Sequence, residues 1–223
     1  MNQEITILLF TAASLGFIHT VLGPDHYVPF IVMSKAGKWS KLKTIWITII
    51  SGIGHVLSSV ILGFIGIGFG TALHEIVAIE SSRGEIASWL MIAFGLVYFV
   101  WGMRRAIKKK GHYHLQSRQA ESEHNHHKIV NLTPWIIFTI FVFGPCEVLI
   151  PLLMYPAAQQ SLVGLILVTL VFGTTTILTM LSIVLLGSFG INIIPLGKVE
   201  RYSHALAGLF IFLSGSAIQF LGL

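Results

Sequence analysis

The chain has 223 residues, of which 54% are hydrophobic and only 10% are charged, and its formal net charge is +5. Soluble domains carry about 25% charged residues, so this composition excludes an ordinary water-soluble protein. The basic residues lie in short segments beside apolar runs, which argues against a nucleic-acid-binding role. A single cysteine, Cys146, excludes a disulfide within the chain.

Six apolar runs are each long enough, with their flanks, to cross ~30 Å of hydrocarbon at ~20 residues per helix. A backbone in lipid must satisfy its own polar groups, so we expect helices. The polar/apolar alternation of a membrane barrel is missing. The fold class is therefore predicted to be all-α, a polytopic membrane protein with six transmembrane helices. These run over residues 5–33, 44–72, 86–103, 134–155, 162–188 and 202–221. The start of the chain lacks the basic residues of a signal peptide, so we expect the first helix to be retained.

Basic residues flank the predicted helices mainly on one side of the membrane. Those after the first, third and fifth helices are Lys35, Lys38, Lys41, Lys43, Arg104, Arg105, Lys108, Lys109, Lys110, Arg118, Lys128, Lys198 and Arg201. The other side has Arg83. Because basic loops stay cytoplasmic, we predict a multi-pass protein of the cell (plasma or inner) membrane with both termini outside and lipid as its surroundings.

The two halves of the chain repeat each other. Gly23-Pro24-Asp25-His26 is matched by Gly144-Pro145-Cys146-Glu147, and glycines of the second and third helices recur in the fifth and sixth. Three helices per half is an odd number, so the second half must enter the membrane from the opposite face. This is the inverted-repeat plan of secondary transporters; the alternative is chance matching in a glycine-rich chain. The predicted units are residues 1–103, a basic loop over 104–131, and residues 132–223.

The first Gly-Pro pair lies among ionisable residues. Pro24 removes a helical hydrogen bond, and Gly23 beside it loosens the helix further. This predicts a break in mid-membrane next to His19, Asp25 and His26. A carboxylate there is costly unless it faces protein, water or a cation, so we favour a binding role. The alternative is an interfacial Asp25 that caps a shorter helix.

His55 and the second Gly-Pro pair, Gly144-Pro145, extend this set. His55 lies deep in the second helix. We favour a role as a ligand or proton carrier; the alternative is a hydrogen-bonded packing residue. Cys146 and Glu147 occupy the repeat positions of Asp25 and His26. Cys146 is equally well explained as a small buried hydrophobe. Together, the imidazole, thiolate and carboxylate groups suit Ni²⁺, Co²⁺ or Zn²⁺, whereas Mg²⁺ and Ca²⁺ prefer oxygen alone.

The central basic loop holds a second group of histidines. Five of the ten histidines of the chain fall in it: His112, His114, His124, His126 and His127. Clustered histidines in a flexible segment suit weak metal capture. A solvated basic linker is the alternative.

These motifs resemble the nickel/cobalt transporter family and its relatives in the LysE-type transporter superfamily, among them nickel/cobalt efflux proteins, urease-accessory membrane proteins and sulfite exporters. The family motif is a histidine, four residues and then Asp-His. Here five residues separate His19 from Asp25-His26. A second motif, Leu-Gly-His-Ser, is echoed by Ile53-Gly54-His55-Val56 without its serine. The resemblance implies a divalent-metal transporter whose first site is lined by His19, Asp25, His26 and His55.

Thiol–disulfide carriers of the cytochrome c biogenesis type also have Pro-Cys in such a repeat. Their chemistry needs two cysteines that meet. The single Cys146 therefore argues against this type, unless two chains pair.

The function favoured by the sequence is a membrane transporter of nickel or cobalt, with zinc as a further ion. Efflux is favoured over uptake, because a cytoplasmic histidine loop suits collection from inside. The metal is the transported substrate, and no cofactor is expected. We find no nucleophile–base pair, phosphate loop or cofactor fingerprint, so no enzyme is predicted. The alternatives are an exporter of a small anion such as sulfite, or of an amino acid, and a non-transporting accessory protein that delivers metal. A homo-oligomer stays open.

Overall fold

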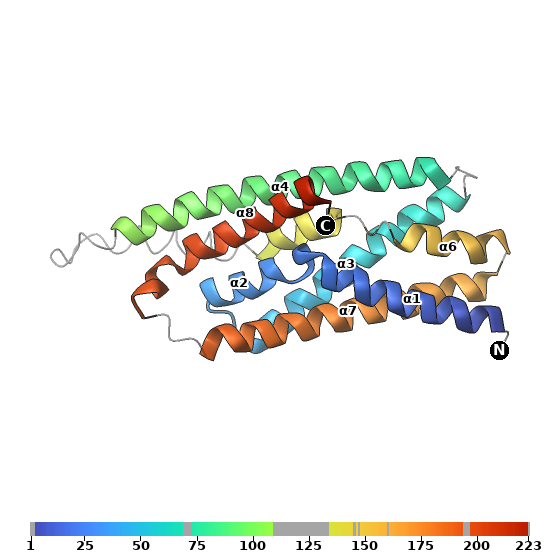
Figure 1. Ribbon diagram of the computed structural model, residues 1–223, viewed down its shortest axis with the longest axis horizontal. Helices are drawn as coiled ribbons and strands as arrows, with labels where there is room; N and C mark the ends of the chain where they lie inside the picture. Colours follow the sequence, from blue (N-terminus) through green and yellow to red (C-terminus); the bar gives the residue numbers. More distant parts are fainter. Residues whose placement is uncertain are drawn as a thin grey trace.

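The computed structural model describes residues 3–68, 73–108, 134–144, 146, 148–159, 161–193 and 197–222. This part of the chain is 93% helical and holds no strand, so the all-α prediction is confirmed. The helices form an elongated bundle and run mostly along its long axis (Figure 1). In chain order they are α1 (Gln3–Leu22), η1 (Pro24–His26), α2 (Val28–Ala36), α3 (Lys41–Gly68), α4 (Leu73–Lys108), the helix Pro134–Phe143, α6 (Leu149–Ala158), α7 (Leu162–Ile193), η2 (Gly197–Tyr202) and α8 (Ser203–Leu221).

Five of the described helices are long and apolar enough to cross a membrane. These spans are Gln3–Leu22, Lys41–Gly66, His74–Lys108, Leu162–Gly190 and Glu200–Leu221. The predicted fourth helix is instead two short pieces, Pro134–Phe143 and α6. The chain is therefore a multi-pass membrane protein with five uninterrupted candidate spans. Six spans arranged as an inverted repeat stay a prediction.

The side chains of α3 are distributed as lipid requires. Its polar residues Thr48, Ser51, His55 and Ser59 follow one face and are fully buried. Its opposite face exposes large apolar side chains, such as Leu57, which is 50% exposed. Polar groups face protein and apolar groups face outward when the surroundings are hydrocarbon. This inverted pattern supports a helix in the membrane.

The first helix is interrupted at its Gly-Pro pair. α1 ends at Leu22, Pro24 to His26 form a single 3₁₀ turn, and α2 begins at Val28. Proline has no N–H to donate, and its ring clashes with the carbonyl four residues earlier, so an α-helix does not continue through it. The N–H of Gly23 still donates to His19 O at 3.0 Å, which places His19 in the last turn before the break.

The third helix is much longer than predicted. It was expected over residues 86–103, but α4 extends from Leu73 to Lys108. Arg83 therefore lies inside a helix rather than in an outer loop, and its Nη1 donates to Oε1 of the fully buried Glu80 at 2.8 Å. The sequence prediction was wrong here because it treated charges as markers of a helix end. An ion pair one turn apart neutralises both charges and lets the helix run on.

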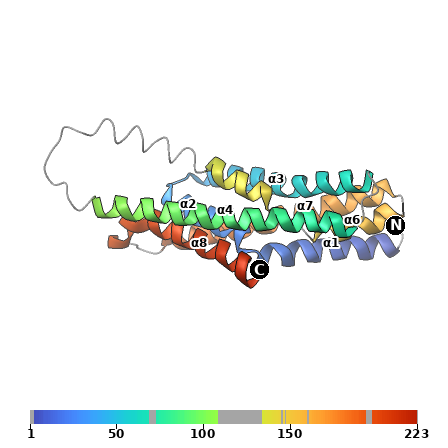
Figure 2. The same ribbon diagram turned by 90° about the horizontal axis from the view of Figure 1, so that it is seen from above.

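α4 and α8 pack closely along much of their length, side by side in both views (Figures 1 and 2). Gly95 and Gly208 lie at their contact. A Cβ added at Gly95 would sit 2.9 Å from Gly208 O, and one added at Gly208 would sit 2.8 Å from Gly95 O. Only residues without a side chain permit this approach. The two backbones therefore meet reciprocally at equivalent positions of the predicted repeat.

Most of the basic residues in the described part of the chain lie at one end of the bundle. The C-terminal ends of α2 and α4 and the short η2 lie together there, and the N-terminus lies at the opposite end (Figure 1). Lys38, just after α2, reaches Glu200 of η2 at 3.6 Å. Grouping at one end agrees with basic segments on one side of a membrane. Which side this is, and so the location of the termini, stays a prediction.

Candidate metal centre

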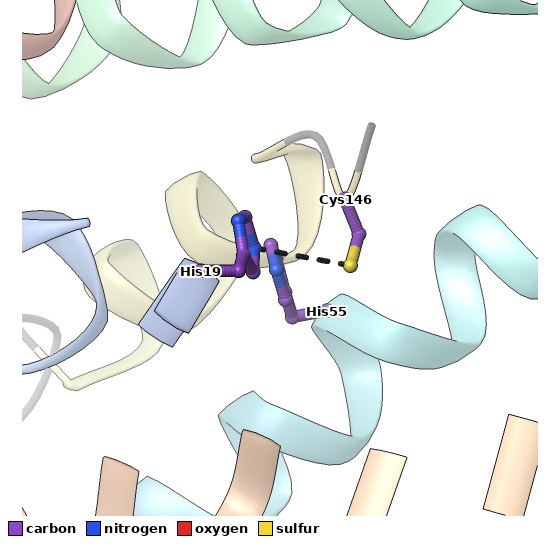
Figure 3. A group of neighbouring side chains, drawn as sticks. All are labelled: His19, His55 and Cys146. Carbon is purple, nitrogen blue, oxygen red and sulfur yellow. Dashed lines mark hydrogen bonds between the residues drawn. The ribbon is translucent and has the colours of Figure 1, made fainter. Parts of the chain in front are cut away.

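Three side chains with metal-ligating atoms converge inside the bundle: His19 of α1, His55 of α3, and Cys146, which lies between the helix Pro134–Phe143 and α6 (Figure 3). Their ligand atoms lie within 4.8 Å of one another, and Cys146 Sγ is 3.9 Å from His19 Nε2. A tetrahedral ion with bonds of ~2.0–2.3 Å holds its ligands roughly 3.3–3.8 Å apart, so small side-chain rotations would close the site. Within the described residues, this is the one His, Cys, Asp and Glu group with such geometry.

Backbone contacts hold Cys146 toward this group. Its N–H donates to Ser59 Oγ of α3 at 3.3 Å. Its carbonyl accepts from the N–H of Leu149, the first residue of α6, at 3.0 Å. Cys146 is fully buried. The thiol is therefore fixed between two elements and shielded from solvent.

His55 is oriented as metal-binding histidines are. Its Nδ1 lies 3.2 Å from Phe141 O. A carbonyl can only accept, so Nδ1 carries the proton and Nε2 carries the lone pair. His55 Nε2 is buried and has no hydrogen-bond partner in the described part of the chain. A second nitrogen tied to a carbonyl fixes ring and tautomer in many metal sites.

His26 has the same arrangement with a carboxylate. Its Nδ1 lies 3.0 Å from Asp25 Oδ1 and 3.2 Å from Gly23 O. Its Nε2 is buried and unpartnered among the described residues. The His26 ring centre is 4.7 Å from that of His19 and 5.0 Å from that of His55. His26 is outside the three-atom group but adjoins it, which makes it the nearest candidate for a fourth donor. Asp25 acts on His26, not on the three-atom group.

Close helix packing brings α3 to the break between the helix Pro134–Phe143 and α6, which we call the second interruption. A Cβ at Gly54, next to His55, would lie 2.6 Å from Val142 Cγ2. The glycine therefore lets the helix Pro134–Phe143 approach until the Phe141 ring stacks on His55 at 4.6 Å. Phe141 also meets His26 edge-on at 5.4 Å. One aromatic ring thus covers two of the imidazoles.

Arg83 of α4, which is paired with Glu80, also contacts the second interruption. Nη2 of Arg83 donates to Val142 O at 3.1 Å and to Ser58 Oγ at 2.9 Å. Ser58 Oγ is also 2.9 Å from Val142 O and 2.8 Å from His55 O. Val142 O belongs to the last turn of a helix that stops at Phe143, so it needs a partner outside its helix. Arg83 and Ser58 supply it.

A small pocket with a volume of about 40 Å³ adjoins the centre. Asp25 and Gly144 lie on its wall, and apart from Asp25 and Ser88 its lining consists of apolar side chains, glycines and Pro29. Apolar walls do not replace the hydration shell of an ion. The pocket thus suits apolar matter better than a hydrated cation.

Other predicted site residues fall outside the described residues. These are Glu147, Pro145 and the loop histidines His112, His114, His124, His126 and His127. Of the predicted ligands that are described, His19, His26, His55 and Cys146 lie together, and Asp25 contacts His26. Their role in metal binding stays a prediction.

Sequence reasoning did not identify Phe141, Glu80 or Arg83 as parts of this region. Glu80 and Arg83 had a usable signal, because two opposite charges three residues apart on an apolar helix indicate a pair. Phe141 had none, since its contribution is a backbone carbonyl and a ring face that depend on tertiary contact.

Comparison with known families gives a match that covers most of the chain. Residues 28–220 match the family described as the cytochrome c biogenesis protein transmembrane region. The chain belongs to this family. No curated protein and no solved structure matches the chain.

The family match corrects the predicted relationship to nickel/cobalt transporters, which is wrong. Gly-Pro breaks and buried histidines are general requirements of any site at a broken membrane helix, so they do not separate families. The features that do separate them, the four-residue spacing and the serine after Gly-His, are those that the chain lacks. The single Cys146 argued against the cytochrome c biogenesis type. The lack of a second cysteine restricts thiol–disulfide chemistry within one chain, but it does not exclude the chain from the family.

Proposed function

We propose that this protein is a non-transporting accessory membrane protein of the cytochrome c biogenesis family that holds one thiophilic metal ion inside its helix bundle. The observation that carries the proposal is the convergence of His19, His55 and Cys146, whose ligand atoms lie within 4.8 Å of one another. Unpartnered Nε2 atoms on His55 and His26 support it, because buried nitrogen atoms without a hydrogen bond are costly unless a ligand meets them.

The donor set favours Zn²⁺ or Cu⁺. Two imidazoles with one thiolate, and a third imidazole beside them, suit these ions. Asp25 is engaged by His26 at 3.0 Å, so no described carboxylate belongs to the three-atom group. Nitrogen and sulfur ligands without carboxylate give no preference for nickel or cobalt. We expect Co²⁺ to enter the site as a spectroscopic substitute for Zn²⁺.

Two features support holding the ion rather than carrying it across. The family is described by cytochrome c biogenesis and not by transport. The pocket beside the centre is lined mainly by apolar side chains, whereas an ion pathway replaces hydration with polar groups. Delivery of metal to a partner therefore fits better than alternating access.

The inverted repeat is retained as part of the proposal. In the repeat, Gly52 corresponds to Gly173 and Val56 corresponds to Ile177. The contact between Gly52 and Ile177 should therefore recur between Gly173 and Val56. A Cβ at Gly52 would lie 3.0 Å from Ile177 Cγ1, and one at Gly173 would lie 3.2 Å from Val56 Cγ1. Such reciprocity, also present at Gly95 and Gly208, is what a two-fold axis between two halves produces.

Thiol–disulfide transfer between chains is the second candidate, because the family description favours it. The Cys146 thiolate would attack a partner's disulfide and release one partner thiolate, leaving a mixed disulfide. This route needs access to sulfur, and Cys146 is fully buried in the structure.

Titration of the purified protein with Co²⁺ tests the proposal. We expect one ion per chain and a sulfur-to-cobalt charge-transfer band that disappears in Cys146→Ser. Zn²⁺ should displace Co²⁺ and protect Cys146 from alkylation. A cobalt spectrum without the sulfur band would contradict the site, and rapid alkylation of metal-loaded protein would favour thiol transfer.

Flux measurements test the accessory role separately. Protein reconstituted in vesicles should bind Zn²⁺ without moving it across the bilayer in either direction. Flux above that of protein-free vesicles, lost in His55→Ala, would establish transport instead.

A further inference from the structure

A second pocket lies at the basic end of the bundle, away from the residues of the metal centre. It has a volume of about 690 Å³, is partly open to solvent, and lies between the end of α2, the start of α3, the end of α7 and η2. We call it the basic pocket. Nothing in the proposed function uses it.

The basic pocket lies where membrane spans end. The span of α3 begins at Lys41, that of α7 ends at Gly190, and that of α8 begins at Glu200. Lys41 and Glu200 line the pocket, and so does Phe189, one residue before the α7 span ends. This is the level of the lipid headgroups, about half a bilayer from the hydrocarbon centre.

The polar part of the pocket carries a positive charge. Lys35, Lys38 and Lys41 line it against one acidic residue, Glu200. The Lys38–Glu200 pair is long, at 3.6 Å, and both side chains are mostly exposed, at 82% and 61%. Exposed pairs of this kind contribute little, so Lys38 can turn to another anion at small cost.

The inner part of the pocket offers hydrogen-bond donors. Ser34 and Ser188 line it and their hydroxyl oxygens are 3.1 Å apart, joining α2 to α7. Trp39 also lines it, and its buried indole N–H has no partner in the described part of the chain. Indole N–H and ammonium groups only donate, so the matching ligand is an acceptor such as a phosphate.

The remaining wall is apolar and opens toward lipid. Leu185, Leu186 and Phe189 of α7 form it, and the last two are 73% and 62% exposed. Water occupies ~30 Å³ per molecule, so the pocket volume of about 690 Å³ exceeds that of one small ion with its waters. A ligand that fills it combines an anionic head with apolar chains.

We propose that the basic pocket binds an anionic phospholipid, with its phosphate held by Lys38 and Lys41 and its acyl chains lying along Leu186 and Phe189. Basic pockets between membrane helices at headgroup level take such lipids. Bound lipid would join α2, α3 and α7 at the end of the bundle.

Retention of phosphatidylglycerol by detergent-purified protein tests the lipid site. Phosphatidylcholine, which has no net charge, is the comparison lipid and should be retained less. Lys38→Gln/Lys41→Gln should lower phosphatidylglycerol affinity roughly tenfold. Both lysines are exposed, so the double variant should fold. The matched control is Arg104→Gln/Lys108→Gln, which removes two exposed charges at the same end outside the pocket and should leave affinity unchanged. Glu200→Gln should raise affinity, because it removes a repelling carboxylate.

A measurement with inorganic phosphate distinguishes a phospholipid headgroup from a free phosphate ion as the ligand of the basic pocket. We expect phosphatidylglycerol to raise the unfolding temperature of the protein and phosphate to leave it unchanged. Equal stabilisation by phosphate would overturn the lipid assignment in favour of a soluble anion. Equal phosphatidylglycerol affinity of the lysine double variant and the wild type would overturn the site itself.

Discussion

The interruption after α1 and the interruption before α6 both contribute to the candidate metal centre, but different contacts hold them. At the first, His26 bonds to Gly23 and Asp25, which are its near neighbours in sequence. At the second, Cys146 is held by Ser59 of α3.

The second interruption depends on distant helices in other ways as well. Val142 O is bound by Ser58 of α3 and Arg83 of α4, and Phe141 O is bound by His55. The first turn is thus organised locally, whereas the second is organised by tertiary contacts. Disturbing α3 or α4 should consequently alter the cysteine side of the centre more than the Asp25 side.

The largest effect is expected at Arg83. Arg83→Met removes the guanidinium from the fully buried Glu80 and from Val142 O, and breaking a buried pair costs about 3–5 kcal/mol. Thermal unfolding in detergent measures this loss. Arg104→Met, an exposed arginine on the same helix, is the control and should change stability little. A double variant Glu80→Gln/Arg83→Met should recover part of the loss, and no recovery would argue against the pair.

The second largest effect is expected for metal affinity in Cys146→Ser. A hydroxyl is a poor ligand for Zn²⁺ or Cu⁺, so we expect at least a ~100-fold loss of affinity, about 2.7 kcal/mol, by competition with a chromophoric chelator. Serine is close in size to cysteine, so the substitution leaves no cavity at the site. His74→Gln, which replaces an exposed histidine on α4, should bind as the wild type does. Wild-type affinity in Cys146→Ser would remove the thiol from the centre.

Asp25→Asn tests the local side of the comparison. The carboxylate orients His26, and loss of such an outer partner typically lowers metal affinity 10–100-fold. The sulfur-to-cobalt band should keep its position, because Cys146 is held by other residues. Glu75→Gln, an exposed carboxylate on α4, serves as the control. A changed sulfur band in Asp25→Asn would show that the two interruptions are coupled.

The smallest effect is expected from Ser59→Ala. It removes one acceptor from the N–H of Cys146, and a hydrogen bond of this kind contributes about 0.5–1.5 kcal/mol to the free energy of unfolding. The cobalt spectrum should shift, because the cysteine loses its link to α3. Ser82→Ala removes an exposed hydroxyl on α4 and should change neither stability nor spectrum. An unshifted spectrum in Ser59→Ala would mean that α6 alone positions Cys146.

Apolar runs and the first Gly-Pro pair were sufficient to predict membrane helices and the place of the first interruption, because hydrocarbon and proline act on the local backbone. Residue chemistry likewise selected His19, His26, His55 and Cys146 as candidates. The chemistry did not settle the family, because unrelated membrane proteins share the same local demands.

Only the tertiary structure decided which candidates meet and which nitrogen of each histidine is left free. Phe141 O orients His55, and Arg83 becomes part of a buried network instead of a loop, through contacts between residues far apart in sequence. The length of α4 was decided in the same way, since the Glu80–Arg83 pair is stable in the bundle where other helices cover it. Local propensity carries no information about such partners, because their distance in the chain does not determine their distance in space.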